Sequence, residues 1–208
     1  MELFCVIFKC VLNSLNLSEL FKNMLTLITV VIGLGTLIKA IVEYSKAQAW
    51  KRAEFLAGVM KEFVNDPNVR LAKVMIDWIS RDVELFPENK KKEDKRVWVN
   101  DEILIEALTP ENWKGTNENP IGYEEHEAKI RDIFDTFFEK LATISHYLET
   151  KLITKQDLRP YITHWIGLIN GNRSEALISQ IDAYLIKYNL SDVIKLLKIS
   201  KELYKSSK

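Results

Sequence analysis

The stretch NMLTLITVVIGLGTLIKAIV, which runs from Asn23 to Val42, decides how this chain is organised. Its twenty residues include one charged side chain, Lys39, which lies three positions before the end of the run. A helix of about 20 predominantly apolar residues spans the hydrocarbon core of a bilayer. The long stem of Lys39 lets its ammonium group reach the headgroups, where a charge costs little. We therefore predict a transmembrane helix over residues 23–42.

A buried core helix and a cleaved signal peptide are the alternative interpretations of this run. A signal peptide fits poorly, because the run begins late, at residue 23. Helical sequence also continues through YSKAQAWKRAEFLAGVMKEF, residues 44–63. The membrane helix is therefore expected to continue into the domain that follows.

Residues 1–22 are apolar but do not read as a second crossing. Their segment LFCVIFKCVL is short for a span and is interrupted by Lys9. We expect an amphipathic, interfacial segment here. Cys5 and Cys10 lack a CxxC or CxxH neighbour, so we assign them neither a disulfide nor a metal.

Charged and aromatic residues near the membrane run predict its orientation. Basic residues gather on its C-terminal side, whereas only Lys22 lies close to its N-terminal end. The positive-inside rule then places residues 43–208 in the cytoplasm. Tyr44 and Trp50 stand where interfacial aromatic residues are common. The predicted membrane-interface residues are Lys39, Tyr44, Trp50, Lys51 and Arg52.

Composition and periodicity predict an all-α fold for residues 43–208. The chain of 208 residues is 47% hydrophobic and has only seven Gly and five Pro, which argues against disorder and against a turn-rich β protein. Asp66 and Pro67 predict a helix N-terminus, Thr154 and Asp157 predict a capping box, and no segment alternates convincingly as a strand. The expected helices cover residues 67 to about 79, a short stretch from near 100, 123–149, about 154–169, 174–188 and a last one from 191. In the first of these helices we expect Val69, Ala72, Ile76 and Trp78 to be buried, and we expect Asn170-Gly171-Asn172 to end the fourth helix.

Charge is balanced over the whole chain but uneven along it. Lys and Arg total 29, as do Asp and Glu, so no overall basic field indicates general nucleic-acid binding. The run from Glu88 to Arg96 has a net charge of +2, and residues 187–208 have a net charge of +4. We interpret both as solvated, with RNA, lipid or partner contact as the alternative.

The sequence holds few groups that suggest catalysis. It has three His, and it has no HExxH, Gly-rich phosphate loop, GxSxG or spaced metal ligands. The acidic cluster Glu124–Glu127 stands at a predicted helix start, where carboxylates favour the helix dipole. We therefore expect no metal, no cofactor and no small-molecule substrate.

One motif remains, Arg159 and His164 in RPYITH. An arginine and a histidine with four residues between them resemble the R-x4-6-H pattern of HEPN domains, helical bundles that pair around a shared cleft. The resemblance implies metal-free RNA cleavage, in which His moves a proton and Arg steadies the phosphate. Active members usually carry a polar residue after the Arg, whereas this chain has Pro160. We therefore treat Arg159 and His164 as motif candidates rather than firm catalytic residues.

The whole arrangement resembles the small membrane accessory proteins of type VI-B CRISPR systems. The resemblance rests on one N-terminal membrane helix, a basic and aromatic junction, an all-α domain and a divergent R-x4-H motif. Residues 50–78 also resemble a widespread group of uncharacterised bacterial membrane-anchored proteins. The first resemblance implies a HEPN-like bundle, a single-pass protein of the bacterial inner membrane and a ring-like homo-oligomer.

That resemblance also implies a function in antiviral defence against phage. The oligomer would form a pore that depolarises the membrane once an RNA-guided RNA-cleaving effector has recognised phage RNA. The lipid bilayer, further copies of the chain and the effector with its RNA are the implied partners. Thr26, Thr29, Gly33 and Thr36 recur at spacings of three and four, so they are candidates to line the pore or to pack helices.

Three functions remain open on the sequence. The first is the non-enzymatic membrane pore, the second a membrane-tethered HEPN ribonuclease, and the third a membrane anchor or scaffold of unknown pathway. All three share one expected organisation, with an interfacial segment at 1–22, a transmembrane helix at 23–42 and a cytoplasmic helical domain at 43–208.

Overall fold

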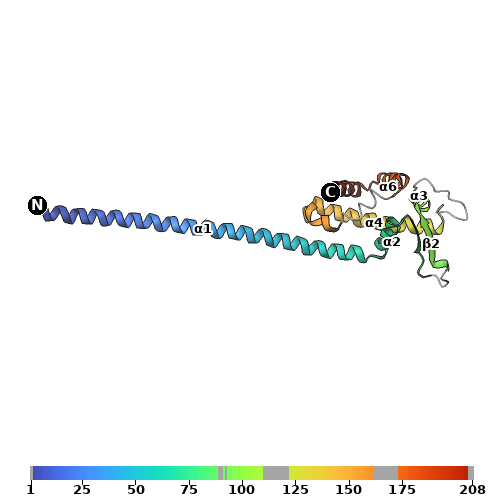
Figure 1. Ribbon diagram of the computed structural model, residues 1–208, viewed down its shortest axis with the longest axis horizontal. Helices are drawn as coiled ribbons and strands as arrows, with labels where there is room; N and C mark the ends of the chain where they lie inside the picture. The colour runs from blue at the N-terminus through green and yellow to red at the C-terminus, as the bar shows by residue number, and fades with distance from the viewer. Residues whose placement is uncertain (1, 89–90, 92, 110–121, 162–172, 206–208) are drawn as a thin grey trace. The chain divides into compact units, whose positions relative to one another are not determined.

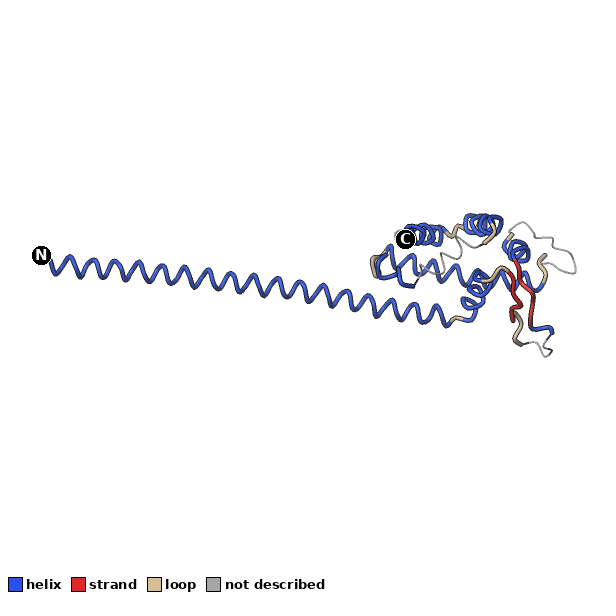
Figure 2. Tube along the Cα trace, viewed as in Figure 1, coloured by secondary structure: helices blue, strands red, loops and turns tan. Residues whose placement is uncertain are grey.

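The computed structural model describes residues 2–88, 91, 93–109, 122–161 and 173–205. These residues are mostly helical (Figures 1 and 2). The helices are α1 (Glu2–Asn65), α2 (Pro67–Asp77), α3 (Asp101–Leu108), α4 (Glu125–Glu149), α6 (Glu175–Lys187) and α7 (Ser191–Lys205). The remaining elements are strands β1 (Ser80–Glu84) and β2 (Arg96–Asn100), a 3-10 turn at Glu93–Lys95 and a helical segment over residues 155–161.

The chain divides into two units, Met1–Lys51 and Arg52–Lys208, which are described separately. Helix α1 begins in the first unit and ends in the second, and it has no break at residue 22 or residue 42. This confirms that the apolar run continues directly into helical sequence. The described boundary falls between Lys51 and Arg52, whereas the sequence placed the start of the domain at residue 43.

The first unit is one helix, and over residues 19–51 its apolar side chains are exposed. Leu25 and Ile38 are each 62% exposed. In the described residues, Glu19–Asn65 is the one candidate membrane span, and its most apolar stretch has a mean hydropathy of 2.3 and no buried residue. A signal sequence passes the same test of length and composition, but the core helix of a soluble domain would be mostly buried.

Helix α1 ends at Asn65 because of the two residues that follow. Asp66 precedes Pro67, and a residue before proline is pushed out of the helical region; its φ and ψ are −65° and 126°. Its carboxylate accepts hydrogen bonds from the amides of Asn68 (2.9 Å) and Val69 (3.1 Å), as an N-cap does. The predicted start of α2 is confirmed.

The core of the second unit is built around α4. Its predicted apolar face is buried, with Phe134, Phe137 and Phe138 at most 2% exposed. The ring of Phe137 lies 6.2 Å from that of Phe63 in α1, and the ring of Phe138 lies 5.8 Å from that of Tyr184 in α6. Helices α2, α3 and α7 also pack on α4. One central helix therefore ties α1 to the remainder of the unit.

The expectation of a purely helical domain is wrong at residues 80–100. Strands β1 and β2 pair antiparallel, with Ser80 opposite Asn100 and Glu84 opposite Arg96. Val83 and Val99 are buried on one face of this hairpin, whereas Trp98 is 59% exposed. β-Branched residues with one buried face favour a strand over a helix. The hairpin also explains why α2 ends at Asp77 and why Trp78, expected in the core, is 53% exposed.

The other predicted helix starts are confirmed where the structure describes them. Asn100 caps α3 and Ser174 caps α6 through their side-chain oxygens. The Glu127 carboxylate accepts a hydrogen bond from the Glu124 amide at 2.9 Å, which places the acidic cluster in the first turn of α4. The predicted helix end at residues 170–172 lies outside the described residues.

Candidate functional site

The four candidate pore residues lie on one face of α1. Steps of three and four residues in a helix return to the same side, so Thr26, Thr29, Gly33 and Thr36 form a stripe. Each threonine hydroxyl donates to a backbone carbonyl of its own helix, at 2.9 Å to Lys22, 2.9 Å to Leu25 and 2.8 Å to Gly33. These hydroxyls are therefore satisfied before any partner arrives, and the stripe suits a helix interface in lipid as well as a polar lumen.

The stripe is longer than the sequence analysis recognised. Steps of four and three alternate without exception along one side of the helix, as in a heptad seam. The small-residue seam consists of Thr26, Thr29, Gly33, Thr36, Ala40 and Ala47, and the same register also passes through Lys22 and Glu43. A Cβ added at Gly33 would meet no atom within 4 Å. Gly33 is therefore not required by the fold of the single chain, and the heptad spacing is the signal that would have found the full seam.

The predicted interface residues are exposed on α1. Tyr44 is 67% exposed and Trp50 is 72% exposed. The Nζ of Lys39 lies 3.8 Å from a carboxylate oxygen of Glu43, one helical turn later. Glu43 thus offsets part of the charge that Lys39 brings to the end of the apolar run.

Arg52 differs from the other predicted interface residues because it belongs to the second unit and has an ion-pair partner there. Its Nε donates to Oδ2 of Asp157 at 3.2 Å, and the two side chains are 32% and 21% exposed. Burial alone would raise the pKa of Asp157. Hydrogen bonds from the hydroxyl (2.7 Å) and amide (2.9 Å) of Thr154, together with Arg52, outweigh burial and hold that pKa below its ordinary value. The predicted capping box is confirmed, and its carboxylate also holds α1.

Arg159 stands near this contact, whereas the position of its motif partner is not described. Arg159 is exposed on the helical segment 155–161, two residues after Asp157. His164 lies outside the described residues, so the motif is described only at Arg159. Pro160 falls in the second turn of the segment and supplies no amide hydrogen to the Gln156 carbonyl.

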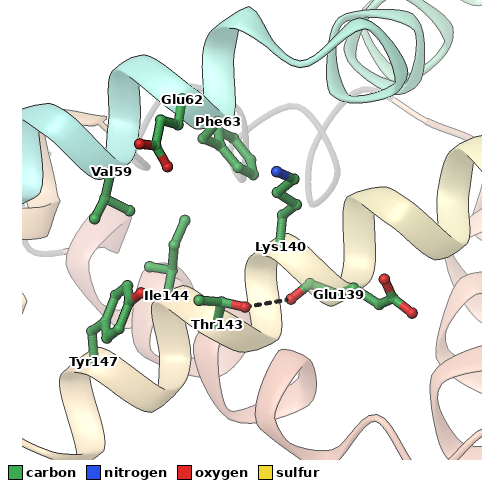
Figure 3. A pocket seen from close by; sticks show the side chains of 8 residues that line it. All are labelled: Val59, Glu62, Phe63, Glu139, Lys140, Thr143, Ile144 and Tyr147. Atoms are coloured by element: carbon green, nitrogen blue, oxygen red, sulfur yellow. Dashed lines mark hydrogen bonds between the residues drawn. The ribbon is translucent and has the colours of Figure 1, made fainter.

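A pocket of about 240 Å³ lies between the C-terminal part of α1 and α4 (Figure 3). Its described lining consists of Val59, Glu62, Phe63, Glu139, Lys140, Thr143, Ile144 and Tyr147. Lys140 is paired with Asp66 at 3.3 Å, and the Thr143 hydroxyl donates to the Glu139 carbonyl at 3.0 Å. The Thr143 hydroxyl and the Lys140 ammonium are thus engaged by a backbone carbonyl and by Asp66, and they are not arranged as a nucleophile beside a base. The pocket marks where α1 and α4 pack loosely.

Two arginines in the bundle hold its elements together. The guanidinium of Arg131 lies 5.0 to 5.1 Å from the ring centres of Tyr123, Tyr184 and Tyr188, and donates to the Tyr123 hydroxyl at 2.8 Å. Cation–π contacts of this kind stabilise a packed arginine. This contact of one arginine with three tyrosines was not predictable from the sequence, because its members are far apart along the chain.

Arg173 is the second such arginine, with a side chain only 3% exposed. The Nη2 atom of Arg173 lies 2.6 Å from the Oδ1 atom of Asp101 at the start of α3. Burial lowers the pKa of Arg173, and the charge of Asp101 opposes that shift. The pair fastens the start of α6 to the start of α3, which is a structural role.

The described residues contain no group of His, Cys, Asp and Glu suited to hold a metal ion. Comparison with protein families, with curated proteins and with solved structures found no match to this chain. The candidate functional features are the small-residue face of α1 in the first unit and, separately, the Arg52–Asp157 contact in the second unit.

Proposed function

We propose that this chain is a membrane protein that self-associates through α1 and permeabilises the bacterial inner membrane during antiviral defence. The observation that carries the proposal is the long run of α1 whose apolar side chains are exposed. A chain that leaves so much apolar surface uncovered needs lipid or protein to bury it. If α1 crosses the membrane once, with residues 43–208 in the cytoplasm, lipid covers most of the helix. Other copies of the chain cover its remaining face.

The small-residue seam supports assembly into a ring. Small side chains let helices approach closely in a membrane, where packing rather than the hydrophobic effect drives association. Thr26, Thr29, Gly33 and Thr36 would line the lumen or the contacts between neighbouring helices.

The continuity of α1 with the bundle supports control of the pore from the cytoplasm. Helix α1 is unbroken through Arg52, where Asp157 holds it, and Phe63 packs on α4. A rearrangement of the bundle would therefore act on the part of α1 that continues into the first unit. In this proposal the HEPN-like bundle receives the signal of an RNA-guided effector, and Arg159 and His164 serve assembly or signalling without cofactor or small-molecule substrate.

The oligomeric state of the detergent-purified full-length protein tests the proposal. Native mass spectrometry of the wild type and of Arg159→Ala/His164→Ala should give a discrete large oligomer for the wild type and smaller species for the double variant. A wild type that remains monomeric or dimeric would contradict the pore and would favour an anchor or scaffold.

A membrane-tethered HEPN ribonuclease is the second candidate, favoured by the exposure of Arg159 on its helix. A polar, exposed arginine can reach an RNA phosphate, and its charge would stabilise negative charge there. This function requires that the purified protein cleave RNA and that Arg159→Ala abolish cleavage while the oligomer persists. Absence of cleavage with any RNA would remove it.

A further inference from the structure

We propose that the second unit carries its own binding surface for anionic lipid headgroups, at the turn that follows α4. This basic end surface consists of Lys151, Lys155, Arg159, Lys198 and Lys201. The inference rests on the proposed membrane anchoring by α1 and adds a second point of contact with the bilayer.

The direction of α4 places this turn at the end of the unit where α1 enters it. Phe63 packs on Phe137 at 6.2 Å and Phe55 packs on Tyr147 at 5.1 Å, so α4 runs antiparallel to this part of α1. Residues after Tyr147 therefore continue toward lower-numbered residues of α1. Three residues of helix advance about 4.5 Å, which brings Thr150 about level with the entry point Arg52.

Helix α7 brings its basic side chains to the same end. Lys195 pairs with Glu149 at 2.6 Å, and Lys155 pairs with Glu202 at 3.6 Å. The second half of α7 is thus fixed beside the end of α4 and the turn, and Figure 1 shows the dark red end of α7 beside the orange end of α4. Lys198 and Lys201, both exposed, lie between these two ion pairs along α7.

Charge is concentrated at this end of the unit. Residues 52–54, 149–161 and 195–202 contain seven Lys and Arg against four Asp and Glu, whereas the remaining residues of the chain contain 22 against 25. Three of the four acidic groups there, Glu149, Asp157 and Glu202, are already paired with basic partners. The net charge of these residues is therefore +3, against −3 for the remaining residues of the chain.

Apolar side chains accompany the basic ones. Leu152 is 50% exposed between Lys151 and Lys155, and Tyr161 is 37% exposed at the end of the following helical segment. Lys151 adopts a left-handed backbone with φ of 60°, which ends α4 in a tight turn and presents Leu152 outward. Basic residues interspersed with exposed apolar and aromatic residues are typical of segments that bind a membrane interface.

The chain between the predicted membrane span and this surface is short enough for contact. Arg52 follows Val42 by ten helical residues, about 15 Å at 1.5 Å each. The polar headgroup region extends about 5 to 8 Å beyond the hydrocarbon core. A connection this short keeps the second unit near the headgroups, where anionic lipid attracts basic side chains over about one Debye length, about 8 Å at physiological ionic strength.

The test uses the full chain in nanodiscs, with an environment-sensitive fluorophore on Leu152→Cys in a Cys5→Ala/Cys10→Ala background. Discs of phosphatidylcholine alone are compared with discs that contain phosphatidylglycerol. We expect a blue shift of the emission with phosphatidylglycerol, and loss of at least half of that shift in Lys151→Gln/Lys155→Gln or in high salt. The charge-preserving Lys151→Arg/Lys155→Arg variant should retain it.

The matched control removes two exposed charges from α2 and the hairpin region, Arg70→Gln/Lys91→Gln, and should leave the shift unchanged. Equal emission in the two kinds of disc would overturn the inference. The inference would also be overturned if the emission shifts when single-stranded RNA is added to phosphatidylcholine discs but does not shift in discs that contain phosphatidylglycerol. That result would assign the surface to RNA. Extraction of the chain from membranes by alkaline carbonate would instead contradict the anchoring itself, so the two failures are distinguishable.

Discussion

The guanidinium of Arg52 and the carboxylate of Asp157 join α1 to the segment that carries Arg159, at an Nε to Oδ2 distance of 3.2 Å. The two residues are 105 positions apart in the sequence. Asp157 also accepts from Thr154, so one carboxylate both starts a helix and holds α1. This contact is where a change in the bundle would act on the part of α1 that continues into the first unit.

Loss of the Arg52–Asp157 contact should weaken the second unit. Because both side chains are partly exposed, we expect Arg52→Ala to lower the free energy of unfolding by about 1 kcal/mol. Thermal unfolding of the full-length protein in detergent measures this. Asp82 and Arg96 form a more exposed pair on the hairpin, 49% and 40% exposed, and Arg96→Ala should therefore cost less. Equal costs would argue against a special role for Arg52.

Acid should destabilise the second unit through Asp66 and Asp157. Burial raises the pKa of each carboxyl, but hydrogen bonds outweigh burial, from the Val69 amide and Lys140 for Asp66 and from Thr154 and Arg52 for Asp157. Both folded-state pKa values therefore lie below the unfolded value, which is about 3.9 for Asp. The stability they contribute is fully present above that value and is lost as the pH falls through the folded pKa.

The measurement is the midpoint of urea unfolding at pH values from about 6 to 3 for the wild type and Asp157→Asn. The variant should be less stable near neutral pH and should lose less stability on acidification, so the two curves converge at low pH. Parallel curves over the whole range would show that Asp157 does not contribute in this way.

The phenylalanine cluster of α4 should dominate the stability of the bundle. Phe137 is fully buried, with ring centres 5.6 Å from Phe138 and 6.2 Å from Phe63. We expect Phe137→Ala to cost about 3 to 5 kcal/mol, through lost burial and the cavity left behind. Trp98→Ala, at a side chain that is 59% exposed, serves as the control and should change stability little. Similar losses in the two variants would mean that the core is elsewhere.

Gly33→Leu should separate assembly from folding. Space is open around Gly33 in the single chain, so the larger side chain does not strain α1. If the small-residue seam packs helices together, leucine there blocks close approach and reduces the oligomer. Size-exclusion chromatography with light scattering, alongside circular dichroism, measures both properties. Gly35→Leu, one position off the seam and equally open, is the matched control; an unchanged oligomer in Gly33→Leu would exclude this face.

Local signals allowed most helix starts to be predicted from the sequence. Asp66, Asn100, Thr154 and Ser174 cap their helices through oxygen atoms that reach only two or three residues along the chain. Such contacts are visible in the sequence because their partners are sequence neighbours. The apolar face of α4 was predictable for the same reason, since its period is that of a single helix.

Contacts between distant residues account for what the sequence did not reveal. The hairpin was missed because five residues such as RVWVN are short evidence for a strand, and its pairing depends on residues 80–84. Arg52–Asp157 and Arg173–Asp101 join residues far apart in the chain, and no local pattern indicates which charges meet. For the motif, Arg159 is placed on a helical segment, and its pairing with His164 stays a prediction.

Ion flux from sealed proteoliposomes tests the central claim most directly. Full-length protein reconstituted into vesicles loaded with potassium and an indicator dye should release potassium once assembled, and Gly33→Leu protein at the same density should release much less. Potassium retention by vesicles that contain the wild type in its large oligomeric form would contradict the account, because an assembled ring that conducts nothing is not a pore.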